Sequence, residues 1–314
     1  MNLSEQVRLA GIVGAGGGGF PTHVKLNARA ETVIANGATQ AFNAHEAKIG
    51  RQLDVLRIYH TPGSWWALTS KEKTFINAGH KLLISFKPNS NLSNVVGVAN
   101  GGSATVDANL AALAHSIASV EPHQIMLIVW HEPENDVIGP GLPGKAGSTA
   151  EYVEMWHNVR GIFDANGVTN VIWCACAETY APLVYLTPSL WPGNSYVDWV
   201  MWDDYQNSTS QPSYTNVLQR DYDWFTTNSS ATNDYLSKPW GVAEWGSDIN
   251  DNPTVAEQTN SINGLNDALN TNNQFPKLKL LEYFDELSPA LLPGSVSTYS
   301  NFANSPYMEQ QCSP

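Results

Sequence analysis

Two glutamates follow short apolar stretches and could act together on one bond. Glu132 comes directly after IMLIVWH at 125–131, and Glu244 lies in PWGVAEWGSD at 239–248. A short, continuous apolar run predicts a strand buried on both faces, as in a parallel sheet, so each glutamate is expected at the carboxyl end of a strand. That end carries the reacting groups in α/β barrels.

Two carboxyl groups on facing strands can cleave a glycosidic bond. One group protonates the leaving oxygen, and the other meets the positive charge that develops at the anomeric carbon. Groups about 5–5.5 Å apart retain the configuration of the sugar, and groups roughly 6.5–9.5 Å apart invert it. A single glutamate at a strand end is usually a surface carboxylate, but two of them, each among tryptophans and glycines, favour a catalytic pair.

The elements that must position these glutamates alternate along the chain. Amphipathic helices are expected between apolar runs; the one over 105–120 has apolar residues at 110, 113, 114, 117 and 120. The exception is the segment 178–195, where the proline and glycine residues predict a short helix or a loop. The expected strands cover 32–38, 53–60, 81–88, 125–131, 168–177, 196–205, 238–246 and 277–286. This rhythm predicts an α/β fold, a (β/α)8 TIM barrel over 31–314.

The first 30 residues differ from the rest and contain the glycine-rich stretch GIVGAGGGGFPTHVK at 11–25. Gly14, Gly16 and Gly19 could let the backbone approach a phosphate, although a glycine tract fits such patterns trivially. A doubly wound sheet would need this loop after its first strand, and here the tract comes before it. We therefore predict a flexible or foreign appendage over 1–30 and no cofactor.

Composition excludes several classes of function. The chain has 314 residues, 14% of them charged, and a formal net charge of −13, so it has no basic footprint for nucleic acid. No apolar run is long enough to span a membrane, and the first twenty residues lack a signal-peptide pattern. The 11 tryptophans suit a bulky core as well as stacking on sugars. We expect the chain to be a monomer and its partner to be a polysaccharide or oligosaccharide.

Three cysteines do not make a disulfide framework. Cys174 and Cys176 share one face of a predicted strand and are poorly placed to bond to each other, so buried free thiols are expected. Cys312 in the C-terminal tail has no evident partner. No spacing typical of metal ligands occurs, and no metal is predicted.

Two segments resemble the catalytic segments of clan A glycoside hydrolases. WHEPE at 130–134 is similar to the acid/base segment, and GVAEWGSD at 241–248 is similar to the nucleophile segment. The histidine before the acid is like the His-Glu pair of family 26, which includes β-mannanases. LISFKP at 83–88 and YVDWVMWDDY at 196–205 also resemble segments of the family.

This resemblance implies a retaining, endo-acting and extracellular enzyme with β-1,4-mannan as its substrate. It makes Glu132 the general acid/base and Glu244 the nucleophile. It also implies that His131 hydrogen-bonds near the acid and that Tyr205 orients the nucleophile. Pro133 and AEWG in place of the usual AEFG depart from the pattern and leave β-1,3-xylan or mixed-linkage β-glucan as alternatives. A barrel that binds carbohydrate without catalysis is the alternative from another class.

Aromatic residues near the two glutamates are candidates for binding the sugar. Trp130 would share a strand face with Glu132, and Trp245 beside Glu244 could cradle the sugar ring. A remote subsite is expected from His60 at the end of the second strand and the aromatic pair that follows it, Trp65 and Trp66.

Charged residues near the strand ends are expected to support the pair. Asp203 could hold Tyr205 or a strand-end backbone group. Arg57 and Lys87 are interpreted as partners in structural ion pairs, and Glu134 as a loop or subsite residue.

The N-terminal segment separately resembles the start of a soluble component of Rnf-type electron-transport complexes and of microcompartment cobalamin reductases. The matching residues are Gly11 to Lys25 and ETVIANGA at 31–38. In those relatives the glycine loop belongs to a nucleotide- or flavin-binding domain, whose remainder and iron–sulfur cysteines are missing here. The resemblance indicates a fusion and makes flavin binding a third hypothesis.

Overall fold

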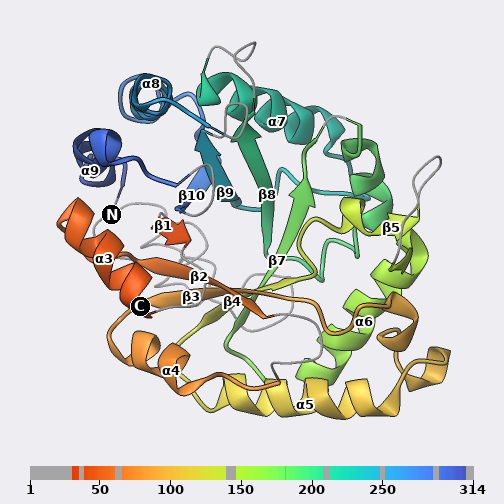
Figure 1. Cartoon of the computed structure of the whole chain (residues 1–314). Coiled ribbons are helices and arrows are strands. Elements are labelled where there is room, and N and C mark those ends of the chain that lie inside the picture. Colours follow the sequence, from red (N-terminus) through yellow and green to blue (C-terminus); the bar gives the residue numbers. More distant parts are fainter. Residues whose placement is uncertain are drawn as a thin grey trace, which may run out of the picture.

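The computed structural model describes residues 30–34, 39–60, 66–138, 146–180, 182–207, 213–247, 252–285 and 290–308. In these ranges a curled parallel sheet is surrounded by helices (Figure 1). Its strands are β1 (Ala30–Ile34), β2 (Val55–His60), β3 (Lys81–Phe86), β4 (Ile125–Val129), β7 (Val171–Glu178), β8 (Trp199–Gln206), β9 (Trp240–Ser247) and β10 (Leu278–Phe284).

The strands pair in the order in which they occur in the chain. Seven of them, from β2 through β3, β4, β7, β8 and β9 to β10, form one continuous parallel sheet. β1 pairs with β10 on one side and with β2 on the other, so the strand order is that of a closed barrel. The two-residue strands β5 (Val137–Ile138) and β6 (Gly147–Ser148) pair separately. The predicted α/β fold with a curled parallel sheet is confirmed.

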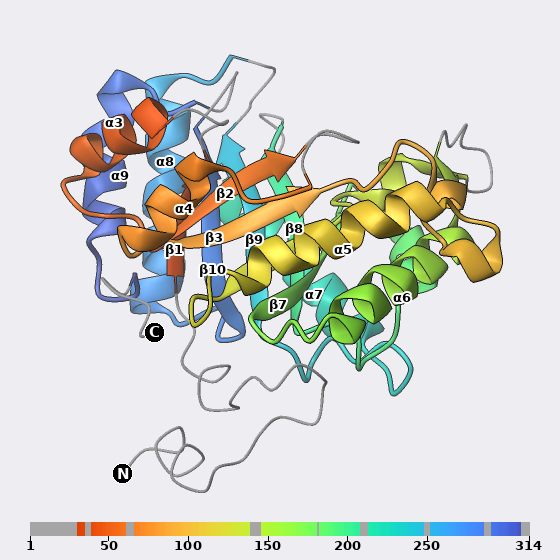
Figure 2. The same cartoon turned by 90° about the horizontal axis from the view of Figure 1, so that it is seen from below.

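Helices cover the outer face of the sheet (Figure 2). Six of them follow the strands as predicted: α3 (Thr39–Ile49), α4 (Ser70–Asn77), α5 (Ala104–Ala118), α6 (Thr149–Ala165), α7 (Tyr214–Asn228) and α8 (Val255–Asn266). After β7 only the 3₁₀ helix η4 (Val184–Leu190) occurs, in the segment expected to be a short helix or a loop. The sequence did not predict α9 (Val296–Ala303), which follows β10. None of the helices in the described ranges is long and apolar enough to cross a membrane.

Three helices begin with the same local device, a capping box. A serine or threonine accepts a hydrogen bond from the backbone three residues on, and a glutamate there bonds back to the cap. The pairs are Thr69 and Glu72, Ser148 and Glu151, and Thr254 and Glu257. Such boxes satisfy backbone donors that the first helical turn leaves open, and so fix where each helix begins.

The buried apolar residues form two layers because successive strand residues point to opposite faces of the sheet. The layer between sheet and helices is the larger one. The other fills the barrel interior: Val55, Leu83, Met126, Ile128, Ile172, Cys174, Cys176, Trp199, Met201, Ala243 and Leu280. Cys174 and Cys176 are buried free thiols, as predicted, whereas Cys312 lies outside the described residues.

The interior layer should carry a large part of the stability. Leu83→Ala removes a side chain that is 0% exposed, and we expect a loss of about 2–5 kcal/mol in the free energy of unfolding because a cavity remains. Val98→Ala, at a side chain that is 54% exposed, should change it by less than about 0.5 kcal/mol. Denaturant titration of the two variants measures the difference, and equal effects would contradict the assignment of the interior layer.

Glu282 on β10 is a polar exception in the buried core. It is 0% exposed, and neither of its carboxyl oxygens has a hydrogen-bond partner among the described residues. Burial raises the pKa of Glu282 well above its usual range, and the Arg57 guanidinium only partly opposes this. Since the folded chain then holds a proton that the unfolded chain releases, the stability must fall as the pH rises above the unfolded pKa.

Glu282→Gln should remove this pH dependence. The variant and the parent should be similarly stable near pH 4, and the variant should gain up to about 1.4 kcal/mol per pH unit above that, until the folded pKa is reached. Urea unfolding between about pH 4 and pH 8 measures the gap. A gap that stays constant over this range would show that Glu282 does not hold the proton.

Candidate active site

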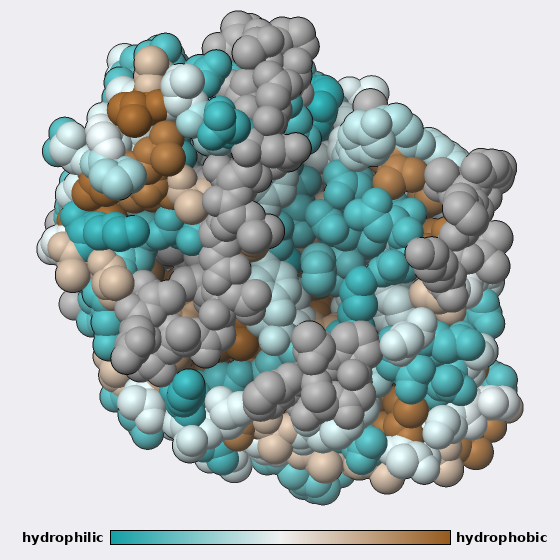
Figure 3. Space-filling model, in the orientation of Figure 1, coloured by the Kyte–Doolittle hydropathy of each residue, from teal (hydrophilic) through white to brown (hydrophobic). Residues whose placement is uncertain are grey.

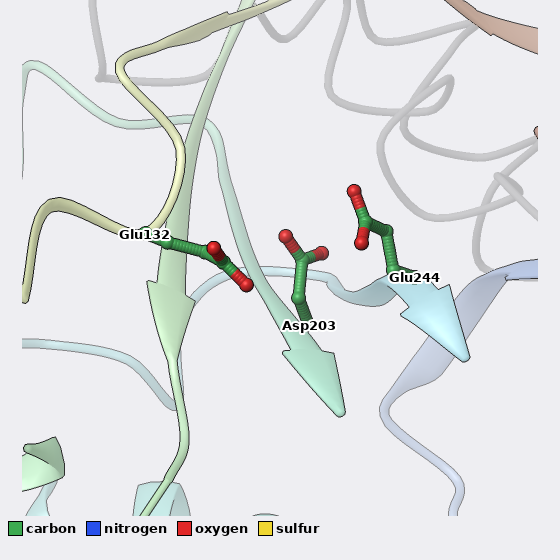
Figure 4. A group of neighbouring side chains, drawn as sticks. All are labelled: Glu132, Asp203 and Glu244. Carbon is green, nitrogen blue, oxygen red and sulfur yellow. The ribbon is translucent and has the colours of Figure 1, made fainter. Parts of the chain in front are cut away.

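Three carboxylates gather where β4, β8 and β9 end. Glu132, Asp203 and Glu244 each place an oxygen within 4.8 Å of the others, and Asp203 lies between the two glutamates (Figure 4). Hydrophilic side chains dominate the middle of the face seen in Figure 3, and apolar patches are separated toward its margins. The structure thus brings together the two glutamates that the sequence singled out, together with a third carboxylate from a neighbouring strand.

A bulge in β9 aims Glu244 at this cluster. Trp202 of β8 pairs with Val242, but the next residue, Asp203, pairs with Glu244, so Ala243 is an extra residue in the ladder. Ala243 belongs to the interior layer, and regular alternation would turn the next side chain outward. Because of the bulge, the consecutive side chains of Ala243 and Glu244 both point to the inner face of the sheet. Bulges often redirect a side chain in this way beside active sites.

Left-handed backbone aims Glu132. β4 ends at Val129, and both Trp130 (φ 61°) and Glu132 (φ 49°) have positive φ values that non-glycine residues rarely adopt. The Glu132 N–H donates to the carbonyl of Cys176 on β7 (3.1 Å), and Pro133 opens the 3₁₀ helix η3 (Pro133–Asn135). Such conformations cost about 1–3 kcal/mol each and persist where the surroundings hold them.

Arg57 of β2 neutralises part of the cluster. Its Nη1 lies 3.1 Å from Asp203 Oδ1 and 3.1 Å from Glu244 Oε1, and the side chain is 0% exposed. It also donates to the carbonyl of Ala243 (2.5 Å) and to Ser85 Oγ (3.1 Å). The ion pairing expected of Arg57 is therefore present, and one of its two carboxylate partners is the candidate nucleophile Glu244.

Two tyrosine hydroxyls hold the Glu244 carboxylate. Tyr205 donates to Oε2 (2.5 Å), which agrees with the orienting contact that the family resemblance implied. Tyr59 of β2 donates to Oε1. Burial, and next the Glu244 charge, raise the pKa of Tyr205 well above its usual range, so it stays a donor. Burial does the same for Tyr59, and the Arg57 guanidinium opposes it.

Glu132 lies in surroundings of the opposite kind. Burial raises its pKa well above the usual range, and the nearby carboxylates Asp203, Glu178 and Glu244 raise it further. Among the described side chains, Asn135 Nδ2 donates a hydrogen bond to its carboxyl (3.2 Å). The surroundings of Glu132 therefore favour its protonated form, whereas the carboxyl of Glu244 is surrounded by hydrogen-bond donors.

The surroundings of His131, the residue before Glu132, favour its neutral form. Burial lowers its pKa well below the usual range, and the charges of Arg57 and Lys87 lower it further. The ring packs edge-on against Tyr59, with 5.5 Å between centroids. Its Nδ1 has no partner among the described residues, so the expected hydrogen bond near the acid is not formed through this atom.

The structure contradicts the sugar-binding roles expected for Trp245 and Trp130. Trp245 is 1% exposed and packs between sheet and helices against Tyr214 and Tyr283, because the β9 bulge turns it outward. Trp130 is also 1% exposed, and its Nε1 donates to Asp136 (2.9 Å). Neither ring has a free face for a sugar, and the predicted shared face of Trp130 and Glu132 is lost where the strand ends.

The three remaining candidates lie in different surroundings. His60 is 4% exposed, bonds through Nε2 to Glu72 (2.6 Å) and lines a pocket of about 290 Å³ at the ends of β2 and α4. Trp65, the aromatic partner in that prediction, lies outside the described residues. Lys87 forms the expected structural ion pair, with Asp136.

Two acidic residues have contacts that the sequence did not indicate. Asp203 bonds to Arg57 rather than to Tyr205, and burial raises its pKa. Glu134 lies in the connection after β4, as one of its two predicted roles requires, but at 1% exposure it does not fit the other role, that of a subsite residue. It accepts hydrogen bonds from the Glu178 N–H (2.9 Å) and Thr187 Oγ1 (2.8 Å). Burial raises the pKa of Glu134 to about 7.

A groove of about 360 Å³ opens beside the carboxylates. Its lining includes Glu132, Glu178, Tyr180, Asp203, Tyr205 and Arg220. Tyr180 is 58% exposed, and so offers an aromatic surface at this groove. A polar groove with one exposed ring fits a neutral polar ligand better than an apolar one.

The three clustered carboxylates also have a spacing at which a cation could bind. Sequence spacing could not indicate this, because each residue comes from a different strand end. Arg57 already contacts two of the three and reduces the attraction for a cation, and an acidic cluster alone does not define a metal site.

Sequence reasoning missed Tyr59 and Asn135 and undervalued Arg57. Arg57 and Tyr59 alternate on the apolar strand LDVLRIYH, and a charge in the middle of a buried strand is a signal that a partner must exist. Nothing in the sequence pointed to Asn135, which lies three residues after Glu132 in a single 3₁₀ turn.

Comparison with known proteins gives one long and two short matches in sequence, and no family model matches the chain. Endoglucanase H of Acetivibrio thermocellus is 25% identical over 266 residues, which are 78% of this chain and 27% of that protein. The chain thus spans about a quarter of the length of this relative. The cobalamin reductase PduS of Citrobacter freundii is 58% identical over 36 residues, 12% of this chain, which agrees with the separate resemblance of the N-terminal segment.

Solved structures similar to this chain include several mannanases. A GH26 β-mannanase from Bacteroides ovatus has a TM-score of 0.66 at 15% identity, covering 91% of each chain. The mannanase man26 from Bacillus subtilis has a TM-score of 0.59 at 16% identity, covering 87% of this chain and 85% of that one. An endo-β-1,4-mannanase from Cellulomonas fimi has a TM-score of 0.63 at 14% identity, covering 92% and 74%. The resemblance to family 26 is confirmed at the level of the fold.

Proposed function

We propose that the chain is a retaining glycoside hydrolase on a (β/α)8 barrel, with Glu132 as general acid/base and Glu244 as nucleophile. The observation that carries this proposal is the short distance between the two groups, whose oxygens approach within 4.8 Å. Retaining enzymes hold their carboxyls about 5–5.5 Å apart, and inverting enzymes leave roughly 6.5–9.5 Å for a water molecule. The short distance supports double displacement.

The different surroundings of the two glutamates support the division of roles. An acid must hold a proton at the pH where the nucleophile is ionised, and environment alone can separate two carboxyls in this way. Burial and neighbouring carboxylates raise the pKa of Glu132. Glu244 instead accepts hydrogen bonds from Tyr59 and Tyr205 and lies against Arg57, contacts that stabilise a carboxylate.

The reaction then follows in two displacements. Glu244 attacks the anomeric carbon while Glu132 gives its proton to the leaving oxygen, and a glycosyl ester forms on Glu244. Glu132, now a carboxylate, takes a proton from water, whose oxygen displaces Glu244 from the sugar. Both catalytic groups return to their starting states. Tyr205 and Tyr59 keep the carboxylate aligned before attack and stabilise it as it leaves.

We propose β-1,4-mannan, cleaved internally, as the substrate. The mannanases among the similar structures support this choice, and the open groove suits a chain that extends beyond the reacting sugar. A β-glucan is the second candidate, because the relative with the long sequence match is named an endoglucanase. Measuring the reducing ends released from mannan, mixed-linkage β-glucan and β-1,3-xylan distinguishes these substrates.

Removal of either glutamate side chain should abolish polysaccharide hydrolysis. We expect Glu132→Ala and Glu244→Ala each to lose at least about a hundredfold in kcat/KM on mannohexaose, whereas Glu154→Gln, an exposed glutamate on α6, should be unaffected. With 2,4-dinitrophenyl β-mannobioside and azide, the Glu132 variant should form the β-glycosyl azide and the Glu244 variant the α-glycosyl azide. NMR of the products identifies the anomer, and the reverse pattern would exchange the two roles.

The alkaline limb of the pH profile should report Glu132. The acid acts only while it is protonated, so kcat/KM on mannohexaose should fall as the pH rises through the raised pKa of Glu132, at higher pH than for an unperturbed glutamate. Dinitrophenolate leaves without a proton, so the same fall should be absent for the dinitrophenyl glycoside. An identical alkaline limb with both substrates would contradict this assignment of the acid.

A further inference from the structure

A further carboxyl, Glu178, lies beside Glu132 at the end of β7. Asn135 spans the two, with its Nδ2 at 3.2 Å from Glu132 Oε2 and 3.3 Å from Glu178 Oε2. Glu132 and Glu178 are also in hydrogen-bond contact with each other. Two ionised carboxylates have no donor between them, so a hydrogen bond between this pair requires a proton on one of them.

The position of Glu178 does not depend on a ligand. Its Oε1 accepts a hydrogen bond from the Tyr180 N–H (2.8 Å), and its own N–H donates to the buried carboxyl of Glu134 (2.9 Å). In the sheet it is the register partner of Asp203 on β8. The side chain is only partly buried and lines the same groove as Glu132.

We propose that Glu178 is a positioning residue that, together with Asn135, orients the Glu132 carboxyl within the groove. This inference rests on the proposed function, which makes Glu132 the acid/base, and assigns a role to a third carboxyl. When Glu132 releases its proton to the leaving oxygen, the pair carries two negative charges, and the Asn135 amide donates to both. When Glu132 takes a proton from water, the shared contact forms again.

Several other groups face this pair. Asp203 and Glu244 approach from β8 and β9, Arg57 binds those two from β2, Arg220 of α7 lines the groove, and Glu134 lies beneath. Burial is the first cause that raises the pKa of Glu132, and Asp203, Glu178 and Glu244 add to it. Among these groups, Glu178 is the one in hydrogen-bond contact with Glu132. Its removal therefore changes both a neighbouring charge and a hydrogen bond at Glu132.

Two variants should shift the Glu132 titration in opposite directions. Glu178→Gln keeps the size and an acceptor for Asn135 but removes a neighbouring charge, so the pKa of Glu132 should fall by about one unit. Asn135→Ala removes the donor between the carboxyls, so the pKa of Glu132 should rise. Asn135 is exposed, and its loss should leave the fold intact.

The titration is followed by ¹³C NMR of protein labelled at the glutamate carboxyl carbons, with Glu132→Gln to assign the resonance. Glu154→Gln is the matched control and should leave the midpoint unchanged. An unchanged midpoint in Glu178→Gln, or shifts of the same sign in both variants, would overturn the proposal. The measurement needs no substrate, so a failure of the hydrolysis assays bears on the proposed function alone.

Discussion

The buried guanidinium of Arg57 is the interaction on which the rest of the site depends. A fully buried charge costs several kcal/mol unless it is paired and hydrogen-bonded. Here the pairing ties together β2, which carries Arg57, and three other strands, through Ser85 on β3, Asp203 on β8, and Ala243 and Glu244 on β9. One cation therefore fixes the geometry of four strand ends and permits two carboxylates to lie side by side in a buried place.

Regular strand geometry does not aim either of the two glutamates. Glu132 owes its direction to left-handed backbone just after β4, and Glu244 to the bulge at Ala243. Both features are local strain or disruption that a stability-optimised barrel would not need. They persist because contacts from neighbouring strands hold them, such as the bond from the Glu132 N–H to the Cys176 carbonyl.

These local distortions explain which features of the fold and the site the sequence could predict and which it could not. Apolar periodicity is a local property, and it predicted the eight strands, six of the outer helices and the missing helix after β7. It also placed Glu132 and Glu244 at strand ends. The side to which Trp245 points depends on how β8 and β9 pair, and that pairing is not written in the segment around Trp245 itself. The partners of Arg57 lie 146 and 186 residues away in sequence, so no local pattern could name them.

The number of acidic groups at the site limits how many of them can be ionised at the same time. Four carboxyl groups, Glu132, Glu178, Asp203 and Glu244, meet there, and Arg57 is the one buried cation that contacts them among the described residues. Because like charges at such distances cannot all remain ionised, some of the charge must be neutralised by protons. Arg57 and the two tyrosines contact Glu244 and not Glu132, so the surroundings favour a proton at Glu132, and burial raises the pKa of Asp203 as well. The unequal distribution of donors thus supports the proposed division into acid and nucleophile without any difference in residue type.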